Sequence, residues 1–372
     1  MSLNAAVRIY GLPVSGASPE NELVDLLRTA AEIEHGLMLQ YLYAMYSATN
    51  PIIAGILRGI AIEEMGHFIC VQNLLLSCGQ APHLGYGKWT DTQFRPFPFK
   101  LEPVSRHSLA KYTIVEQPDD RHIDPAQRAD LGRISEDALL SAGQHVEPFR
   151  VGLLYAKIYW LLRPSDEELA DPTMEPWSGF PVKETAARKE HAGRHVREGF
   201  IINASARNAV GRHWKGTHDT MIVKAIADRP GALALVAEVS AQGEGFGVTP
   251  DGHFDRFVEA WRNASKPGDL ARPSPIDPWY GPPQADPPTG DEITSRIGIL
   301  FARVSDCLYE VILLATALYF LLPEAVAPQV RAKPARAAIL AMRDCLKTAA
   351  SALNGTPLRA GGSTKDAVCG LS

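Results

Sequence analysis

The feature that most constrains this chain is a pair of consecutive apolar helical stripes, each with ionisable residues at its centre. Apolar side chains recur in alternating steps of four and three residues over 23–48 and again over 53–78, which is the spacing of one face of an α-helix. Glu34 lies in the middle of the first stripe, and Glu64 and His67 lie in the middle of the second. The sequence therefore predicts two helices that carry three ionisable side chains into a core.

A buried carboxylate is costly unless it is protonated, paired or bound to a metal. Glu64 and His67 are three residues apart, so they project from one helix face and can hold one ion together. Di-iron carboxylate bundles take a Glu from each of two helices and a Glu-x-x-His from each of the other two. The stripes supply half of that set, which favours a metal site. The alternative is a metal-free Glu64–His67 pair, with Glu34 hydrogen-bonded to Tyr41 or Tyr43.

Register separates the two adjacent carboxylates of the second stripe. Glu63 lies ~100° around the helix from Glu64 and off the apolar face. We therefore expect Glu64, and not Glu63, to be the ligand.

Composition excludes several classes of function. The chain has 372 residues, 46% of them hydrophobic, and a net charge of −5, so it can bury a large core and has no basic run that would bind nucleic acid. Its most apolar window, 311–322, is shorter than the ~20 residues that span a bilayer and predicts a buried helix rather than a membrane partner. Five scattered Cys and no evident signal peptide indicate free thiols in a reducing, cytoplasmic location.

Further helices alternate with long excursions. After a lead-in over 1–20, the two stripe helices are expected to end near 49 and 79, and an ordered wrap over 80–130 is expected to hold a short strand near 110–115. A third helix is expected over 134–162, and a fourth over 232–242 that resumes near 252. Between them, His191 and His195 have a helical metal-ligand spacing, but Gly193 favours solvent-facing histidines. A Pro-rich linker over 264–290 leads to two last helices, over 291–322 and 327–353.

The interrupted fourth helix offers the rest of a site. Glu244 and His253 are nine residues apart and cannot share one continuous helical face. A helix break between them would let both side chains reach one point. From spacing alone, an exposed turn at Glu244 is an equal alternative.

Several motifs together resemble one family. Ile33-Glu34-His35, Glu63-Glu64-Met65-Gly66-His67, and Gln242-Gly243-Glu244-Gly245 followed by His253-Phe254-Asp255-Arg256-Phe257 are similar to the ferritin-like iminophenyl-pyruvate dimer synthases of bisindole biosynthesis. The likeness runs from about residue 20 to the end. It implies an all-α fold, namely a ferritin-like four-helix bundle with extra C-terminal helices and long ordered loops. It also implies the metal ligands Glu34, Glu64, His67, Glu244 and His253.

One position departs from that family. Where its third helix often carries a Glu, this chain has Leu153, which cannot bind metal. Glu147, almost two turns earlier, is a weak candidate replacement. We therefore expect one ion to be held tightly and a second to be held weakly or not at all.

These observations predict a bundle over 21–263 and a C-terminal part over 264–372 packed on it. The expected function is a non-haem iron oxidoreductase, with one or two Fe ions and Mn as the alternative, acting on an aromatic or amino-acid-derived small molecule. A homo-oligomer is left open. The alternative function is a non-catalytic or degenerate metal-binding protein, and iron storage is disfavoured by the long excursions. Four aromatic residues could wall a substrate pocket or simply pack in the core: Trp89, Phe97, Trp160 and Trp214.

Overall fold

The structure is a computed structural model, and helices account for its regular secondary structure. It describes residues 17–85, 97, 99–118, 123–142, 151–164, 193–216, 218–243, 251–265, 270–272, 274, 276–281, 290–353 and 356–361. Within these ranges the chain forms isolated β-bridges but no strand. The predicted all-α class is confirmed.

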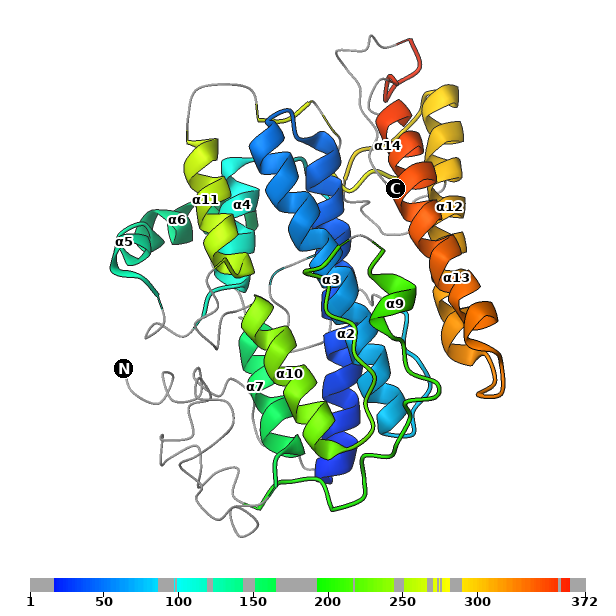
Figure 1. The fold of residues 1–372 in the computed structure, drawn as a ribbon. Coiled ribbons are helices and arrows are strands. Elements are labelled where there is room, and N and C mark those ends of the chain that lie inside the picture. The colour runs from blue at the N-terminus through cyan, green and yellow to red at the C-terminus, as the bar shows by residue number, and fades with distance from the viewer. Residues whose placement is uncertain are drawn as a thin grey trace.

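The two stripe helices form as the sequence predicts. They are α2 (Pro19–Ser47) and α3 (Pro51–Ser77), joined by a tight connection. Ser18 and Asn50 cap their N-termini by accepting hydrogen bonds from backbone N–H groups of the first turn, and each helix begins with Pro. They lie side by side as the longest pair of the bundle (Figure 1).

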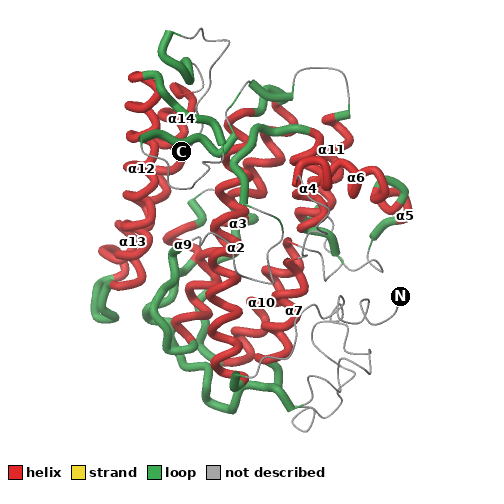
Figure 2. Tube along the Cα trace, turned by 180° about the vertical axis from the view of Figure 1, so that it is seen from behind, coloured by secondary structure: helices red, strands yellow, loops and turns green. Residues whose placement is uncertain are grey.

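The other half of the bundle consists of four shorter helices that meet end to end. These are α4 (Arg106–Val115), α7 (Val151–Leu162), α10 (Arg229–Gly243) and α11 (His253–Ala264). In both views α11 lies beside α4 and α10 lies beside α7 (Figures 1 and 2). The third and fourth helices of the bundle are thus each split in two near mid-height.

The residues predicted to form the third helix, 134–162, lie in α6 (Leu131–Ala142) and α7, and 143–150 fall outside the described residues. The expectation of a strand over 110–115 is wrong, because these residues belong to α4, which is followed by the short α5 (Pro125–Arg128). Ser105 and Ser108 cap α4 reciprocally, and this cap with tertiary packing outweighs the β-propensity of the segment.

The C-terminal helices pack against one side of the bundle. They are α12 (Arg296–Leu321), α13 (Pro328–Leu340), a π-helical segment (Ala341–Leu346) and α14 (Lys347–Leu353) (Figure 1). His35 on α2 contacts the Tyr309 hydroxyl on α12. The expectation that 311–322 is buried holds for one face, with Ile312, Tyr319 and Phe320 buried, and is wrong for the other, where four large apolar side chains are 50–64% exposed: Val311, Leu314, Leu318 and Leu321. No helix among the described residues has the length and hydropathy needed to cross a bilayer.

The histidines of the segment between α7 and α10 do not all face solvent. His213, in the short helix α9 (Gly211–Trp214), is buried, and its Nδ1 lies 2.9 Å from the Tyr319 hydroxyl on α12. His195 is half-buried and stacks on Trp160, and the described residues 193–200 are not helical. His191 lies outside the described residues. His195 thus faces solvent only in part, and the buried His213 ties this segment to the C-terminal helices.

Candidate metal centre

Four of the five sequence-predicted ligands converge at mid-height of the bundle. Glu34 comes from α2, Glu64 and His67 come from α3, and His253 is the first residue of α11. All four side chains are at most 2% exposed. The fifth, Glu244, lies outside the described residues, in the segment that joins α10 to α11.

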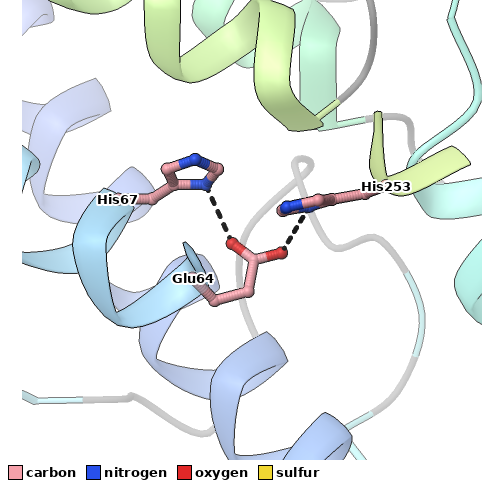
Figure 3. Close-up of side chains that lie close together, drawn as sticks. All are labelled: Glu64, His67 and His253. Atoms are coloured by element: carbon pink, nitrogen blue, oxygen red, sulfur yellow. Dashed lines mark hydrogen bonds and ion pairs between the residues drawn. The ribbon is translucent and has the colours of Figure 1, made fainter. Parts of the chain in front are cut away.

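Glu64 occupies the centre of the cluster. One carboxylate oxygen, Oε2, lies 3.0 Å from Nδ1 of His67, and the other, Oε1, lies 3.1 Å from Nδ1 of His253. Figure 3 shows the carboxylate between the two imidazoles. One ligand atom from each of the three residues falls within 4.8 Å of the others, a spacing that can hold a metal ion.

Two further carboxylates flank this centre, one beside each histidine. Oε2 of Glu34 lies 3.6 Å from Nδ1 of His67, and Oε2 of Glu116 lies 3.6 Å from Nδ1 of His253. Each imidazole therefore faces the shared Glu64 and one outer carboxylate. This arrangement provides two neighbouring half-sites that share Glu64.

Glu116 is the residue that the sequence analysis missed. It is the C-cap of α4 and is 1% exposed. It comes from α4 rather than from α7, the helix that carries Leu153, and it is a candidate for the carboxylate that Leu153 cannot supply. Glu147 lies outside the described residues. A signal was present, because Leu109, Tyr112 and Glu116 repeat the three-then-four spacing that leads to Glu34 on α2.

The far nitrogen of each imidazole meets an acceptor. Nε2 of His253 lies 2.9 Å from a carboxylate oxygen of Glu63, and Nε2 of His67 lies 3.0 Å from the amide oxygen of Gln242. Both rings satisfy these acceptors by carrying a proton on Nε2, which leaves each Nδ1 as the ligand atom. Glu63, which also pairs with Arg256, thus lies behind the His253 ring rather than facing the centre.

Two tyrosines orient the outer carboxylates. The Tyr155 hydroxyl donates to Oε1 of Glu34 at 2.5 Å, and the Tyr41 hydroxyl donates to Oε1 of Glu116 at 2.6 Å. The metal-free alternative expected Tyr41 or Tyr43 to bond Glu34, so the partners differ from that expectation. Each carboxylate is left with its other oxygen directed toward a histidine, as in metal sites whose ligands are oriented by outer hydrogen bonds.

Without a metal, protons balance the charge of the cluster. Burial and the neighbouring Glu64 charge raise the pKa of Glu34 to about 7. Burial lowers the pKa of His67, but hydrogen bonds and charge from Glu34 and Glu64 outweigh it and raise the value to about 10. The pKa of His253 is likewise well above its usual range, since the Glu64 charge and the surrounding carboxylates outweigh burial. A cation bound here would replace these protons.

The buried atoms fit a metal ion. Oε2 of Glu34, Oε1 of Glu64 and Nδ1 of His253 are buried, and their contacts with the other ionisable groups of the cluster do not have the geometry of a regular hydrogen bond. Space is left beside them because Gly243 ends α10 there: a Cβ at Gly243 would lie 3.5 Å from Oε2 of Glu116 and 4.0 Å from Nδ1 of His253. Carboxylate and imidazole donors suit iron and manganese.

The split helical bundle and the buried carboxylate–histidine cluster together define a class of protein. Comparison of the sequence with protein-family models identifies that class. The family model described as Ferritin-like matches residues 27–261. The chain belongs to the ferritin-like family, so the predicted fold is confirmed.

Two curated relatives are similar in sequence to part of the chain. Dichlorochromopyrrolate synthase of Lentzea aerocolonigenes is 31% identical over 142 residues, which cover 29% of this chain and 14% of that protein. 2-Imino-3-(indol-3-yl)propanoate dimerase of Chromobacterium violaceum is 30% identical over 139 residues, which cover 28% of this chain and 14% of that protein. The chain thus spans about one seventh of the length of these relatives. The resemblance drawn from the motifs is confirmed.

A solved structure of a ferritin-like protein from Caulobacter vibrioides is also similar. It superposes with a TM-score of 0.48 at 16% sequence identity, covering 89% of this chain and 96% of that chain.

Proposed function

We propose that this protein is a non-haem iron oxidoreductase that acts on an aromatic, amino-acid-derived metabolite. The observation that carries the proposal is the buried cluster in which Glu64 lies between two histidines, each also facing a second carboxylate. Membership of the ferritin-like family supports iron as the metal, with manganese as the alternative.

Five described side chains would hold the metal: Glu34, Glu64, His67, Glu116 and His253. Glu244 remains a candidate from the sequence. Iron bound there would supply the electron transfer between substrate and dioxygen or peroxide. The chain contributes what surrounds it: Tyr155 and Tyr41 fix the outer carboxylates, and Glu63 and Gln242 fix the two rings. Burial of the cluster excludes bulk water.

The name of one relative and one surface hollow support the choice of substrate class. The Chromobacterium relative is named for an imine that combines an indole ring with a carboxylate. A hollow of about 320 Å³ opens beside Gln117, the residue after Glu116, and is also lined by Arg128 and Leu131. Its volume is in the range of small-molecule sites, and Arg128 suits a carboxylate while Leu131 suits an aromatic face. We take an aromatic 2-imino acid as the substrate class.

The direct test combines iron loading with oxygen consumption. Protein is loaded anaerobically with Fe(II) and then mixed with air-saturated buffer in which an amino-acid oxidase and catalase generate the imine from L-tryptophan. After subtraction of the oxygen that the oxidase itself consumes, loaded protein should consume imine and oxygen faster than metal-free protein, and the Glu64→Gln variant should lose that difference. Equal rates for loaded and metal-free protein would contradict the proposal.

A second candidate is a metal-binding protein without catalysis. The observation that favours it is the burial of every described ligand to at most 2% exposure, which restricts direct access of a substrate to the metal. This candidate predicts that iron binds in full but that its absorbance does not change on exposure to oxygen or peroxide. An oxygen-dependent spectral change that requires Glu64 would exclude it.

A further inference from the structure

Helix α12 carries an exposed apolar stripe that nothing in the described fold covers. The stripe consists of Ile297, Leu300, Val304, Cys307, Val311, Leu314, Leu318 and Leu321. Its seven aliphatic side chains are 42–64% exposed, and Cys307 is also exposed. The helix lies at the outer edge of the molecule, on the side away from α5 and α6 (Figures 1 and 2).

The residues of the stripe have the spacing of a coiled-coil interface between two helices. Successive members are three and four residues apart in strict alternation over the whole helix, an average period of 3.5. The opposite face of α12 is already used, since Ala302, Ile312 and Tyr319 are buried against the rest of the chain. The helix thus has one face for its own core and a second face with the pattern of a coiled coil.

We propose that this stripe is a dimer interface in which α12 packs antiparallel against α12 of a second copy of this chain. Two exposed charges beside the stripe, Arg303 and Glu310, support this choice. They occupy equivalent heptad positions seven residues apart. In an antiparallel pair, equivalent flanking positions face each other, so Arg303 meets Glu310 of the partner subunit, and the two-fold axis repeats the contact. In a parallel pair Arg303 would instead face the partner's Leu308.

The register set by this charge pair limits the size of the interface. With Arg303 opposite Glu310 of the partner subunit, the two stripes overlap over 297–314, and Leu318 and Leu321 lie beyond the overlap. Five aliphatic side chains that each expose about 80–100 Å² give roughly 450 Å² per chain and about 900 Å² for the pair, which is the range of weak, transient interfaces. We therefore expect a reversible dimer with a dissociation constant in the micromolar range.

The first test measures the mass of the full chain by sedimentation equilibrium over a concentration series. The wild type should show reversible association to twice the mass of one chain. Leu300→Asp should weaken association at least tenfold. Leu140→Asp is the matched control, because Leu140 is 68% exposed on α6, far from α12, and it should leave association unchanged. Circular dichroism and melting curves verify that both variants stay folded. A wild type that is monomeric at all concentrations, or equal effects of both variants, overturns the proposal.

The second test addresses orientation. Arg303→Glu or Glu310→Arg alone should weaken the dimer, and the double variant should restore it. Arg303 also lies over the Tyr280 ring at 5.7 Å, so recovery in the double variant separates the intersubunit contact from that local one. No recovery contradicts the antiparallel pair. Binding of the monomer to neutral phospholipid vesicles, abolished by Leu300→Asp, would mean that a lipid surface occupies the stripe and would likewise overturn the proposal.

Discussion

Metal binding should expel protons from the cluster in a number that the structure sets. At pH 7 the Glu34 carboxyl, with a pKa of about 7, is about half protonated. His67, with a pKa of about 10, and His253, with a pKa well above its usual range, each hold one proton more than a metal-bound imidazole can keep. Loading the chain at pH 7 should therefore release about 2.5 protons, of which about 0.5 come from Glu34 and about 1 from each histidine.

Isothermal titration calorimetry with Mn(II), which is stable in air, measures this number. The observed binding enthalpy is plotted against the ionisation enthalpy of several buffers, and the slope gives the protons released per chain. At pH 8.5 the value should fall to about 2, because Glu34 is by then ionised. Glu34→Gln should give about 2 at both pH values. Release below about one proton at pH 7 would mean that the histidines do not exchange protons for metal, and it would refute the proposed ligand set.

Three further outcomes follow from the same geometry. Glu64→Gln should remove most bound metal in elemental analysis, whereas Glu63→Gln should keep the stoichiometry and weaken affinity about 10–100-fold, as loss of a ligand-orienting group does; equal loss in both would contradict the roles. Gly243→Leu places a side chain beside Oε2 of Glu116 and should lower metal content without lowering helicity. Full metal loading of this variant would show that the metal does not occupy the space beside Gly243. Chelation should lower the melting temperature more at pH 8.5 than at pH 6. The pKa values of Glu34 and His67 are raised in the metal-free fold, so the stability that these groups contribute is complete below their pKa values in the unfolded chain and is lost as pH rises through about 7 and about 10. Bound metal removes this loss of stability. An equal drop in melting temperature at both pH values would argue against this linkage.

The first half of the fold could be predicted because its signals are local. In α2 and α3 the apolar spacing, the caps Ser18 and Asn50 and the prolines all agree, and they place Glu34, Glu64 and His67 on facing sides. Such agreement needs no knowledge of the rest of the chain.

The second half depends on contacts between distant segments. The ten-residue helix α4 is too short to be stable alone and forms through its cap and its packing against α11. The β-propensity of its sequence predicts a strand instead, and a strand would not have shown that Glu116 belongs to the cluster. Glu63 acquires its role only because α11 brings His253 to it across 190 positions of sequence. Hydropathy likewise could not show that one side of α12 is exposed, because the exposed stripe and the buried face of this helix are both apolar.

The most direct test of the central claim is the number and place of metal ions in a crystal. Crystals of the full chain grown anaerobically with Fe(II) are measured on both sides of the iron absorption edge. We expect two anomalous peaks within ~4 Å of each other, one on each side of the Glu64 carboxylate, with His67 beside one and His253 beside the other. A single fully occupied peak, or peaks that do not contact Glu64, would contradict the shared centre.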